Sequence, residues 1–230
     1  MNGLIHSSLY FGMLVSVGAY MLGVWLKKKT GRAILNPLLV AIIVVIAFLS
    51  VFHIEYKEYN RGAVYLGYFL TPATVCLAIP LYKQLELLRQ HLIAVASAIV
   101  AGVAGSVGSI YVMCRFFQLE HTHYVTLLPK SITTAIGMGV SEEAGGIVTL
   151  TVISIIITGI LGNIIADWLF QIFKIEEPIA KGLALGTAAH AIGTAKALEL
   201  GEIEGAMSSL SIAVAGLLTV VVVPLMSGLI

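Results

Sequence analysis

Five apolar runs, each about as long as a bilayer is thick, limit most strongly what this chain can fold into. A membrane-spanning helix needs about 20 mostly apolar residues, and such runs lie at residues 9–26, 35–52, 92–114, 147–173 and 204–230. Hydrophobic residues make up 59% of the chain and charged residues 11%, whereas about 25% of a soluble domain is charged. We therefore expect an all-α protein with several transmembrane helices in a lipid bilayer.

Basic residues between the apolar runs predict how the chain lies in the membrane. One cluster falls at residues 27–32, after the first run, and Lys83 and Arg89 precede the third run. Loops rich in Lys and Arg stay in the cytosol, so both loops are predicted inside and both chain ends outside. No basic residue precedes the first run, so this run predicts a spanning helix and not a cleavable signal peptide.

Three further segments, residues 67–82, 128–146 and 182–201, are apolar on average but interrupted by Pro or Gly together with Thr, Ser or charge. Backbone left unpaired at membrane depth is tolerated only where it lines a cavity or is buried in protein. The second and third segments either span the membrane fully or re-enter from one side, and the sequence leaves both alternatives open. The residues expected to break the helices are Pro72, Pro80, Pro129, Gly137, Gly139, Gly186 and Gly193.

A short internal echo links the second and third interrupted segments. The tripeptide Ala-Ile-Gly ends at Gly137 and again at Gly193, an offset of 193 − 137 = 56, and a glutamate and a glycine follow at the same spacing in both copies. Each copy precedes a long apolar helix, which favours a duplicated unit, although chance is an alternative in a chain so rich in Gly and Ala. We expect one membrane domain over residues 1–230, divisible into repeat units of about 1–120 and 121–230.

Four ionisable residues of the interrupted segments are candidates for a buried site: Lys130, His190, Lys196 and Glu199. A charge at the centre of a spanning helix costs about 2.5–3.5 kcal/mol on insertion scales, so such groups normally face a cavity or a partner. Lys196 and Glu199 lie near a predicted helix end, where reaching to the membrane surface is the alternative. His190 would share a helical face with two threonines, three residues before it and four after it.

These groups predict a site for an anion. Helix ends inside the membrane would present partial positive charge and free N–H groups at their N-termini, and transporters use paired broken segments in this way. Close helix packing would also account for the glycines, but it would not account for Lys130 or His190. An anionic substrate held by half-helix ends, threonine hydroxyls and one lysine is therefore the predicted ligand.

Enzyme and metal motifs are absent from the sequence. It contains no H-E-x-x-H, G-x-S-x-G or phosphate-binding glycine loop, and its histidines form no metal-ligand set at helical spacing. Two cysteines inside apolar stretches do not suggest a disulfide framework, and a net charge of +1 gives no reason to expect nucleic acid. We expect no enzymatic activity, no metal and no cofactor.

Three blocks of sequence carry a resemblance to a known family: "LTPATVCLAIPLY", "LPKSITTAIGMGVSEEAGG" and "LGTAAHAIGTAKALELGEIEGAMSSLSIAVAG". Together they resemble the LrgB/CidB family, over nearly the whole chain. The family is also similar to the membrane domain of the plant plastid glycolate/glycerate translocator, in which an LrgA-like part precedes the LrgB-like part. Because this chain has only the second part, the resemblance implies a separate small CidA- or LrgA-like membrane partner.

The resemblance implies two kinds of function. Bacterial members are described as antiholin-like proteins that modulate murein hydrolase activity and cell lysis, whereas the plant relatives move small monocarboxylates such as glycolate, glycerate or pyruvate. We expect a carboxylate carrier in a bacterial plasma membrane, because a regulator acting only by helix association would not need Lys130 and His190. A channel and an antiholin-like interaction protein are the alternative functions. The sequence does not decide whether the protein is a homo-oligomer.

Motif by motif, the resemblance selects a set of substrate-binding residues. Lys130 is the predicted charge partner of the carboxylate, and His190 a hydrogen-bond donor or a proton-coupling group, since histidine titrates near neutrality. The full set is Thr71, Pro72, Lys130, Ser131, Thr133, Thr134, His190, Gly193 and Thr194. Ala135 stands where many relatives have proline.

Overall fold

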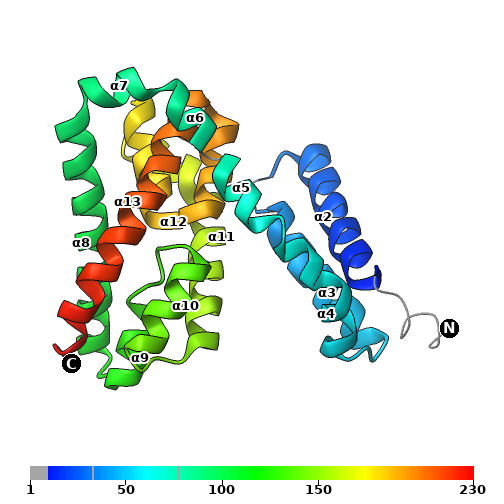
Figure 1. Cartoon of the computed structure of the whole chain (residues 1–230). Helices are drawn as coiled ribbons and strands as arrows, with labels where there is room; N and C mark the ends of the chain where they lie inside the picture. Colours follow the sequence, from blue (N-terminus) through cyan, green and yellow to red (C-terminus); the bar gives the residue numbers. More distant parts are fainter. Residues whose placement is uncertain (1–9, 33, 77) are drawn as a thin grey trace. The chain divides into compact units, whose positions relative to one another are not determined.

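The computed structural model describes residues 10–32, 34–76 and 78–230, and every regular element in these ranges is an α-helix (Figure 1). The chain divides into two compact units, Met1–Cys76 and Leu77–Ile230. The predicted all-α architecture is confirmed.

The first unit contains α2 (Phe11–Thr30), α3 (Pro37–Val51), α4 (Tyr56–Gly67) and α5 (Leu70–Cys76). The loop into α3 is fixed by Asn36, whose Oδ1 accepts hydrogen bonds from the backbone N–H of Leu38 (2.9 Å) and Leu39 (3.3 Å), an N-cap of the usual kind. The predicted runs at 9–26 and 35–52 correspond to α2 and α3, and α3 is a shorter apolar helix of 15 residues.

The second unit contains three helices that are long and apolar enough to cross a membrane: α8 (Leu92–Phe116), α11 (Val148–Ile172) and α13 (Glu202–Ser227). They correspond to the last three predicted runs. Two short helices, α6 (Ala78–Lys83) and α7 (Leu85–Gln90), precede α8 and carry Lys83 and Arg89. We call the end of the unit where α8 begins the basic end, and the end where α13 finishes the C-terminal end.

The interrupted segment at residues 128–146 forms a helical hairpin with α9 (His121–Leu127) as its first arm and α10 (Thr134–Glu143) as its second. Thr151 Oγ1 of α11 lies 2.9 Å from the carbonyl oxygen of Thr126, at the end of the first arm, and 2.7 Å from Ser141 Oγ, far along the second arm. Residues 15 apart in sequence would be about 22 Å apart on a straight helix, so the second arm folds back antiparallel to the first. This first hairpin enters and leaves at the C-terminal end, and its tip is the non-helical stretch 128–133.

The interrupted segment at residues 182–201 lies within α12 (Pro178–Leu200), which is broken at His190 (φ 42°, ψ −136°). A methyl group on Gly193 would lie 2.8 Å from Cβ of Ala189 and would overlap the carbonyl oxygen of Leu185. Residues eight apart on a straight helix are about 12 Å apart, so α12 folds back on itself. It forms a second hairpin with a first arm at 178–189, a tip at His190 and a second arm at 191–200.

The second hairpin enters from the basic end. Gly182 of its first arm lies against Glu204 at the start of α13, and Lys196 of its second arm reaches Asp167 near the end of α11. The second unit is therefore built from α8, a hairpin from the C-terminal end, α11 running back, a hairpin from the basic end, and α13 running to the C-terminal end (Figure 1). Both segments fold back as hairpins, which is the arrangement that the re-entrant alternative predicts.

The predicted helix breakers are corrected at most positions. Pro129 does lie in a break, but Gly137, Gly139, Gly186 and Gly193 all lie in helical turns, and the second break is at His190. Some of these glycines allow helices to approach: a methyl group on Gly186 would lie 2.9 Å from Cα of Ser208 on α13. Pro72 and Pro80 lie in the first turns of α5 and α6, where proline is tolerated.

Candidate functional site

A cavity of about 1040 Å³ lies within the second unit. One face of α8 lines it almost entirely with small residues, such as Ala94, Ala98 and Gly102, while α11 and the first arm of the second hairpin contribute larger apolar side chains. Residue 91, the N-cap of α8, and residue 109 of α8 both line it, so it extends along roughly 27 Å at 1.5 Å per residue. The cavity therefore reaches from the basic end to the middle of the unit.

Lys130 and Ser131, at the tip of the first hairpin, form the inner end of the cavity. Lys130 Nζ donates to Ser131 Oγ (3.0 Å), and Ser106 Oγ of α8 donates to the same oxygen (2.9 Å). A hydroxyl oxygen accepts two hydrogen bonds and donates one, so the hydrogen of Ser131 is left for an acceptor in the cavity. Ser131 is only 7% exposed.

Lys130 has no carboxylate partner in the described part of the chain, unlike Lys196, which pairs with Asp167. Its Nζ carries three N–H groups, and the bond to Ser131 uses one of them. Immediately after the tip, α10 begins at Thr134, and a helix N-terminus carries partial positive charge. The inner end of the cavity thus presents hydrogen-bond donors and positive charge, the combination that a carboxylate requires.

The structure brings together only part of the predicted site. Lys130 and Ser131 line the cavity, whereas Thr133 and Thr134 are half-buried beside the tip and do not line it. The remaining predicted residues of the second unit are behind the cavity wall, and Thr71 and Pro72 belong to α5 in the first unit. The Thr71 side chain lies outside the described part of the structure. For all of these residues, a role in substrate binding stays a prediction.

His190 is held by the protein itself. Its side chain is 3% exposed, and Nε2–H donates to the carbonyl oxygen of Ile155 on α11 (2.9 Å). A methyl group on Gly159 would lie 2.8 Å from the imidazole ring, so the ring occupies the space that this glycine leaves on α11. The histidine therefore attaches the tip of the second hairpin to α11, and its ring is not part of the cavity lining.

Gly193 and Thr194 belong to the same tip. Gly193 has no room for a side chain, because the two arms meet there. Thr194 is fully buried, and its hydroxyl is 2.7 Å from Ser208 Oγ on α13 and donates to the carbonyl oxygen of His190 (3.1 Å). These two residues shape the fold of the tip.

Several hydroxyl groups of the cavity are absent from the site predicted from the sequence. Thr187, on the first arm of the second hairpin, and Thr158 of α11 line it, as do Ser106 and Ser109 of α8. A signal for Thr187 was present in the sequence, because 187 − 131 = 56 places it at the repeat offset from Ser131. The serines of α8 had no comparable signal, since only the folded chain places them opposite the hairpin tip.

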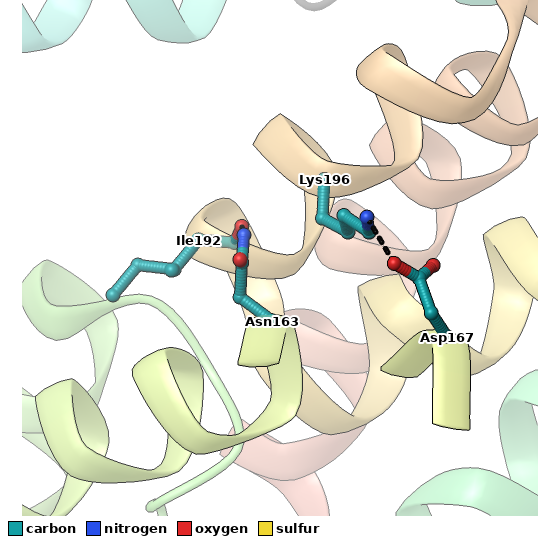
Figure 2. A network of polar contacts seen from close by, with 4 residues as sticks. All are labelled: Asn163, Asp167, Ile192 and Lys196. Atoms are coloured by element: carbon teal, nitrogen blue, oxygen red, sulfur yellow. Dashed lines mark hydrogen bonds and ion pairs between the residues drawn. The ribbon is translucent and has the colours of Figure 1, made fainter. Parts of the chain in front are cut away.

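A second polar network joins the second hairpin to α11, outside the cavity lining (Figure 2). Lys196 Nζ pairs with Asp167 Oδ2 at 2.6 Å, and their side chains are 12% and 44% exposed. One turn earlier on each helix, Asn163 Nδ2 donates to the carbonyl oxygen of Ile192 (3.1 Å). Lys196 thus has an anionic partner within the protein. Among the described residues, no group of three or more metal-ligating side chains occurs.

The sequence model of the LrgB-like family matches residues 16–229. The chain belongs to the LrgB-like family. This LrgB-like chain is 41% identical over 217 residues to the antiholin-like protein LrgB of Bacillus mycoides (strain KBAB4), and 39% identical over 216 residues to the antiholin-like protein LrgB of Bacillus subtilis (strain 168). Each alignment covers 94% of both chains.

No solved structure matches this LrgB-like chain. Neither the family description nor the two names describes an enzyme. With three helices in its described part that are long and apolar enough to span a bilayer, the chain is an all-α membrane protein of this family. The resemblance found in the three sequence blocks is therefore confirmed.

Proposed function

We propose that this protein is a carrier of small monocarboxylates, of the glycolate, glycerate and pyruvate class, in a bacterial plasma membrane. The observation that carries the proposal is the lysine at the tip of the first hairpin, which has no carboxylate partner in the described chain and faces a cavity in the middle of the unit. By the positive-inside rule, the basic end lies in the cytosol.

A carboxylate substrate would complete this site. Its two oxygens could accept from Lys130 Nζ and from the free hydrogen of Ser131, whose other hydrogen-bonding positions are already used. Hydrogen bonds to charged groups contribute about 1.5–3 kcal/mol, which corresponds to roughly a tenfold to 150-fold change in affinity. In this arrangement Lys130 supplies the positive charge, and the single free hydrogen of Ser131 orients the carboxylate.

Uptake of labelled glycolate, glycerate and pyruvate into proteoliposomes tests the proposal. We expect saturable uptake and counterflow, which distinguish a carrier from a channel, and a loss of at least tenfold in Lys130→Ala at substrate concentrations below saturation. Lys83→Ala is the matched control, because Lys83 is exposed on α6 and should not affect flux. Wild-type flux that Lys130→Ala leaves unchanged would remove the assignment.

The names of the relatives favour a second candidate function. Proteins that are 39% and 41% identical are named antiholin-like, which supports a regulator of murein hydrolase activity and cell lysis acting with a CidA- or LrgA-like membrane partner. On names alone this candidate is the better supported of the two, whereas the cavity and Lys130 favour the carrier.

Lysis assays in cells that lack the native gene separate the two candidates. If the protein is a regulator that acts by association alone, the Lys130→Ala variant should restore lysis control in these cells and should still copurify with the partner. If lysis control follows the loss of transport while the partner still copurifies, the regulatory effect is a consequence of carboxylate flux.

A further inference from the structure

The second unit contains a structural repeat with the same offset as the sequence echo. Helix α8 runs from Leu92 to Phe116 and α11 from Val148 to Ile172, and both ends differ by 56 residues (148 − 92 and 172 − 116). Each helix is followed by a hairpin. The second arms of these hairpins, 134–143 and 191–200, differ by 57.

The two copies have opposite directions. Helix α8 runs from the basic end to the C-terminal end and its hairpin enters from the C-terminal end, whereas α11 runs back and its hairpin enters from the basic end. Residues 92–143 and 148–200 therefore form an inverted repeat, which we call repeat A and repeat B.

In the middle of the cavity, the lining residues of repeat A and repeat B occupy equivalent positions. The residues of α11 that line it are Thr158, Leu161, Gly162 and Ile165, and those 56 positions earlier on α8, Gly102, Gly105, Ser106 and Ser109, line it too. The hydroxyl residues at the two hairpin tips, Ser131 and Thr187, are also 56 apart and both line it. The cavity thus lies on the approximate two-fold axis of the repeat, and Lys130, whose counterpart is Gly186, breaks the symmetry.

Toward its two ends the cavity is asymmetric. At the basic end it continues between α8 and the second hairpin past Ala98 and Ala184 to His91. The counterparts of Ala98 and Ala184 at the C-terminal end are Ser154 and Leu128, which do not line the cavity.

At the C-terminal end the path is filled by side chains. Leu128 and Tyr124 are fully buried, and Tyr124 donates its hydroxyl hydrogen to the carbonyl oxygen of Met226 on α13 (3.0 Å). In the described structure the cavity is therefore open along α8, the long helix of repeat A, and closed along α11, the long helix of repeat B.

We propose that the two repeats exchange these conformations, so that a second access path opens from the C-terminal end, between α11 and the first hairpin, past Ser154, Tyr124 and Leu128. Inverted repeats around a central site are the usual basis of alternating access, because each half can adopt the conformation of the other. The inference rests on the proposed carrier function. It adds the position of the path that is closed in this structure.

Cysteine accessibility tests the second path in a background with Cys76→Ala and Cys114→Ala. The two single variants at counterpart positions, Ala98→Cys and Ser154→Cys, are each reconstituted into proteoliposomes. A membrane-impermeant thiol reagent is then applied from either side, in opposite gradients of pyruvate. We expect Ala98→Cys to react from the basic end and Ser154→Cys from the C-terminal end, with opposite dependence on the gradient. Ile153→Cys, next to Ser154 but on the exposed side of α11, is the matched control and should react from neither side.

Tyr124→Phe sharpens the test. Loss of one hydrogen bond that closes the C-terminal end should shift the two populations by about twofold to tenfold, which raises the reaction rate of Ser154→Cys and lowers that of Ala98→Cys. A merely structural role for Tyr124 would not move the two rates in opposite directions.

The outcomes separate the two proposals. If the cysteine variants take up pyruvate with saturable kinetics but Ser154→Cys stays unreactive in every gradient and in Tyr124→Phe, the exchange of repeats is overturned and the carrier stands. If the two rates change reciprocally in Tyr124→Phe while no acid is transported, the exchange stands and the carrier function falls.

Discussion

The two hairpins of the second unit occupy equivalent places in an inverted repeat, yet their tips differ in what they face. The first has a non-helical tip of six residues, 128–133, and presents Lys130 to the cavity. The second turns at one residue, His190, whose ring is directed away into α11. One tip directs donors into the cavity, and the other uses its donor to hold the hairpin against α11.

Under the proposed function, this difference gives the first hairpin tip a binding role and the second a positioning role, although the two tips are related by the repeat. A site on a symmetry axis must still bind an asymmetric ligand, and a single cation on one tip gives a carboxylate one preferred end. The tip of the second hairpin then needs no charge of its own, and its contact with α11 serves to hold it in a fixed position. Substitutions at matched positions of the two hairpins can break or sharpen this contrast.

The largest difference is expected at the matched glycines of the two second arms. A methyl group on Gly193 would overlap the backbone carbonyl of Leu185, whereas on Gly137 it would meet Cδ1 of Ile155, the mobile end of a side chain. Overpacking against backbone costs about 1–3 kcal/mol or more, so Gly193→Ala should lower the free energy of unfolding by about 3 kcal/mol and Gly137→Ala by less than about 1 kcal/mol. Unfolding curves in detergent measure both, and equal losses would contradict the comparison.

His190→Ala should mainly destabilise the protein. It removes the bond to Ile155 and empties a buried site, at a cost of about 2 kcal/mol. His190→Gly should be about 1 kcal/mol more stable than His190→Ala, because glycine relieves the strain of a positive φ. The folded fraction of each variant should transport pyruvate with a KM within about twofold of the wild type.

A large rise in KM without loss of stability in either His190 variant would instead place the imidazole on the substrate. That result would favour the role predicted from the sequence over the positioning role.

The hydroxyl groups of the two tips should contribute unequally to transport. Ser131→Ala removes the donor beside Lys130 and should raise KM about tenfold, the effect of losing one hydrogen bond of about 1.5 kcal/mol to the charged carboxylate. Thr187→Val should raise KM by less than about twofold, because the Thr187 hydroxyl already donates to the carbonyl oxygen of Leu183 (2.8 Å). Ser97→Ala, on an exposed position of α8, is the control. A larger effect at Thr187 than at Ser131 would reverse the assignment of the two tips.

The smallest effect is expected for the ion pair that joins the second hairpin to α11 (Figure 2). Because Asp167 is 44% exposed, water screens the pair, and exposed pairs contribute about 0–1 kcal/mol. Lys196→Met and Asp167→Asn, alone and combined, should give a coupling free energy below about 1 kcal/mol in a double-mutant cycle. A coupling of several kcal/mol would mean that this network, more than His190, holds the hairpin.

The sequence predicted the long helices better than the breaks between them. Length and apolarity alone identify α8, α11 and α13, because a bilayer accepts few other sequences. The sequence predicts breaks at Gly137, Gly186 and Gly193, but these glycines lie inside helices and allow close contacts there. A glycine permits a break and a close approach equally well, and only the neighbouring chain shows which one occurs.

The sequence by itself determined an all-α membrane protein, a cation in an interrupted segment, and an echo with an offset of 56 residues. These follow from composition and order along the chain, which are local properties. The tertiary structure decided that the second and third interrupted segments are hairpins from opposite ends, that Lys130 faces a cavity while His190 faces α11, and that Ser131 and Thr187 line the same cavity. Contacts between residues far apart in sequence depend on which helices pack together, and no local pattern encodes that.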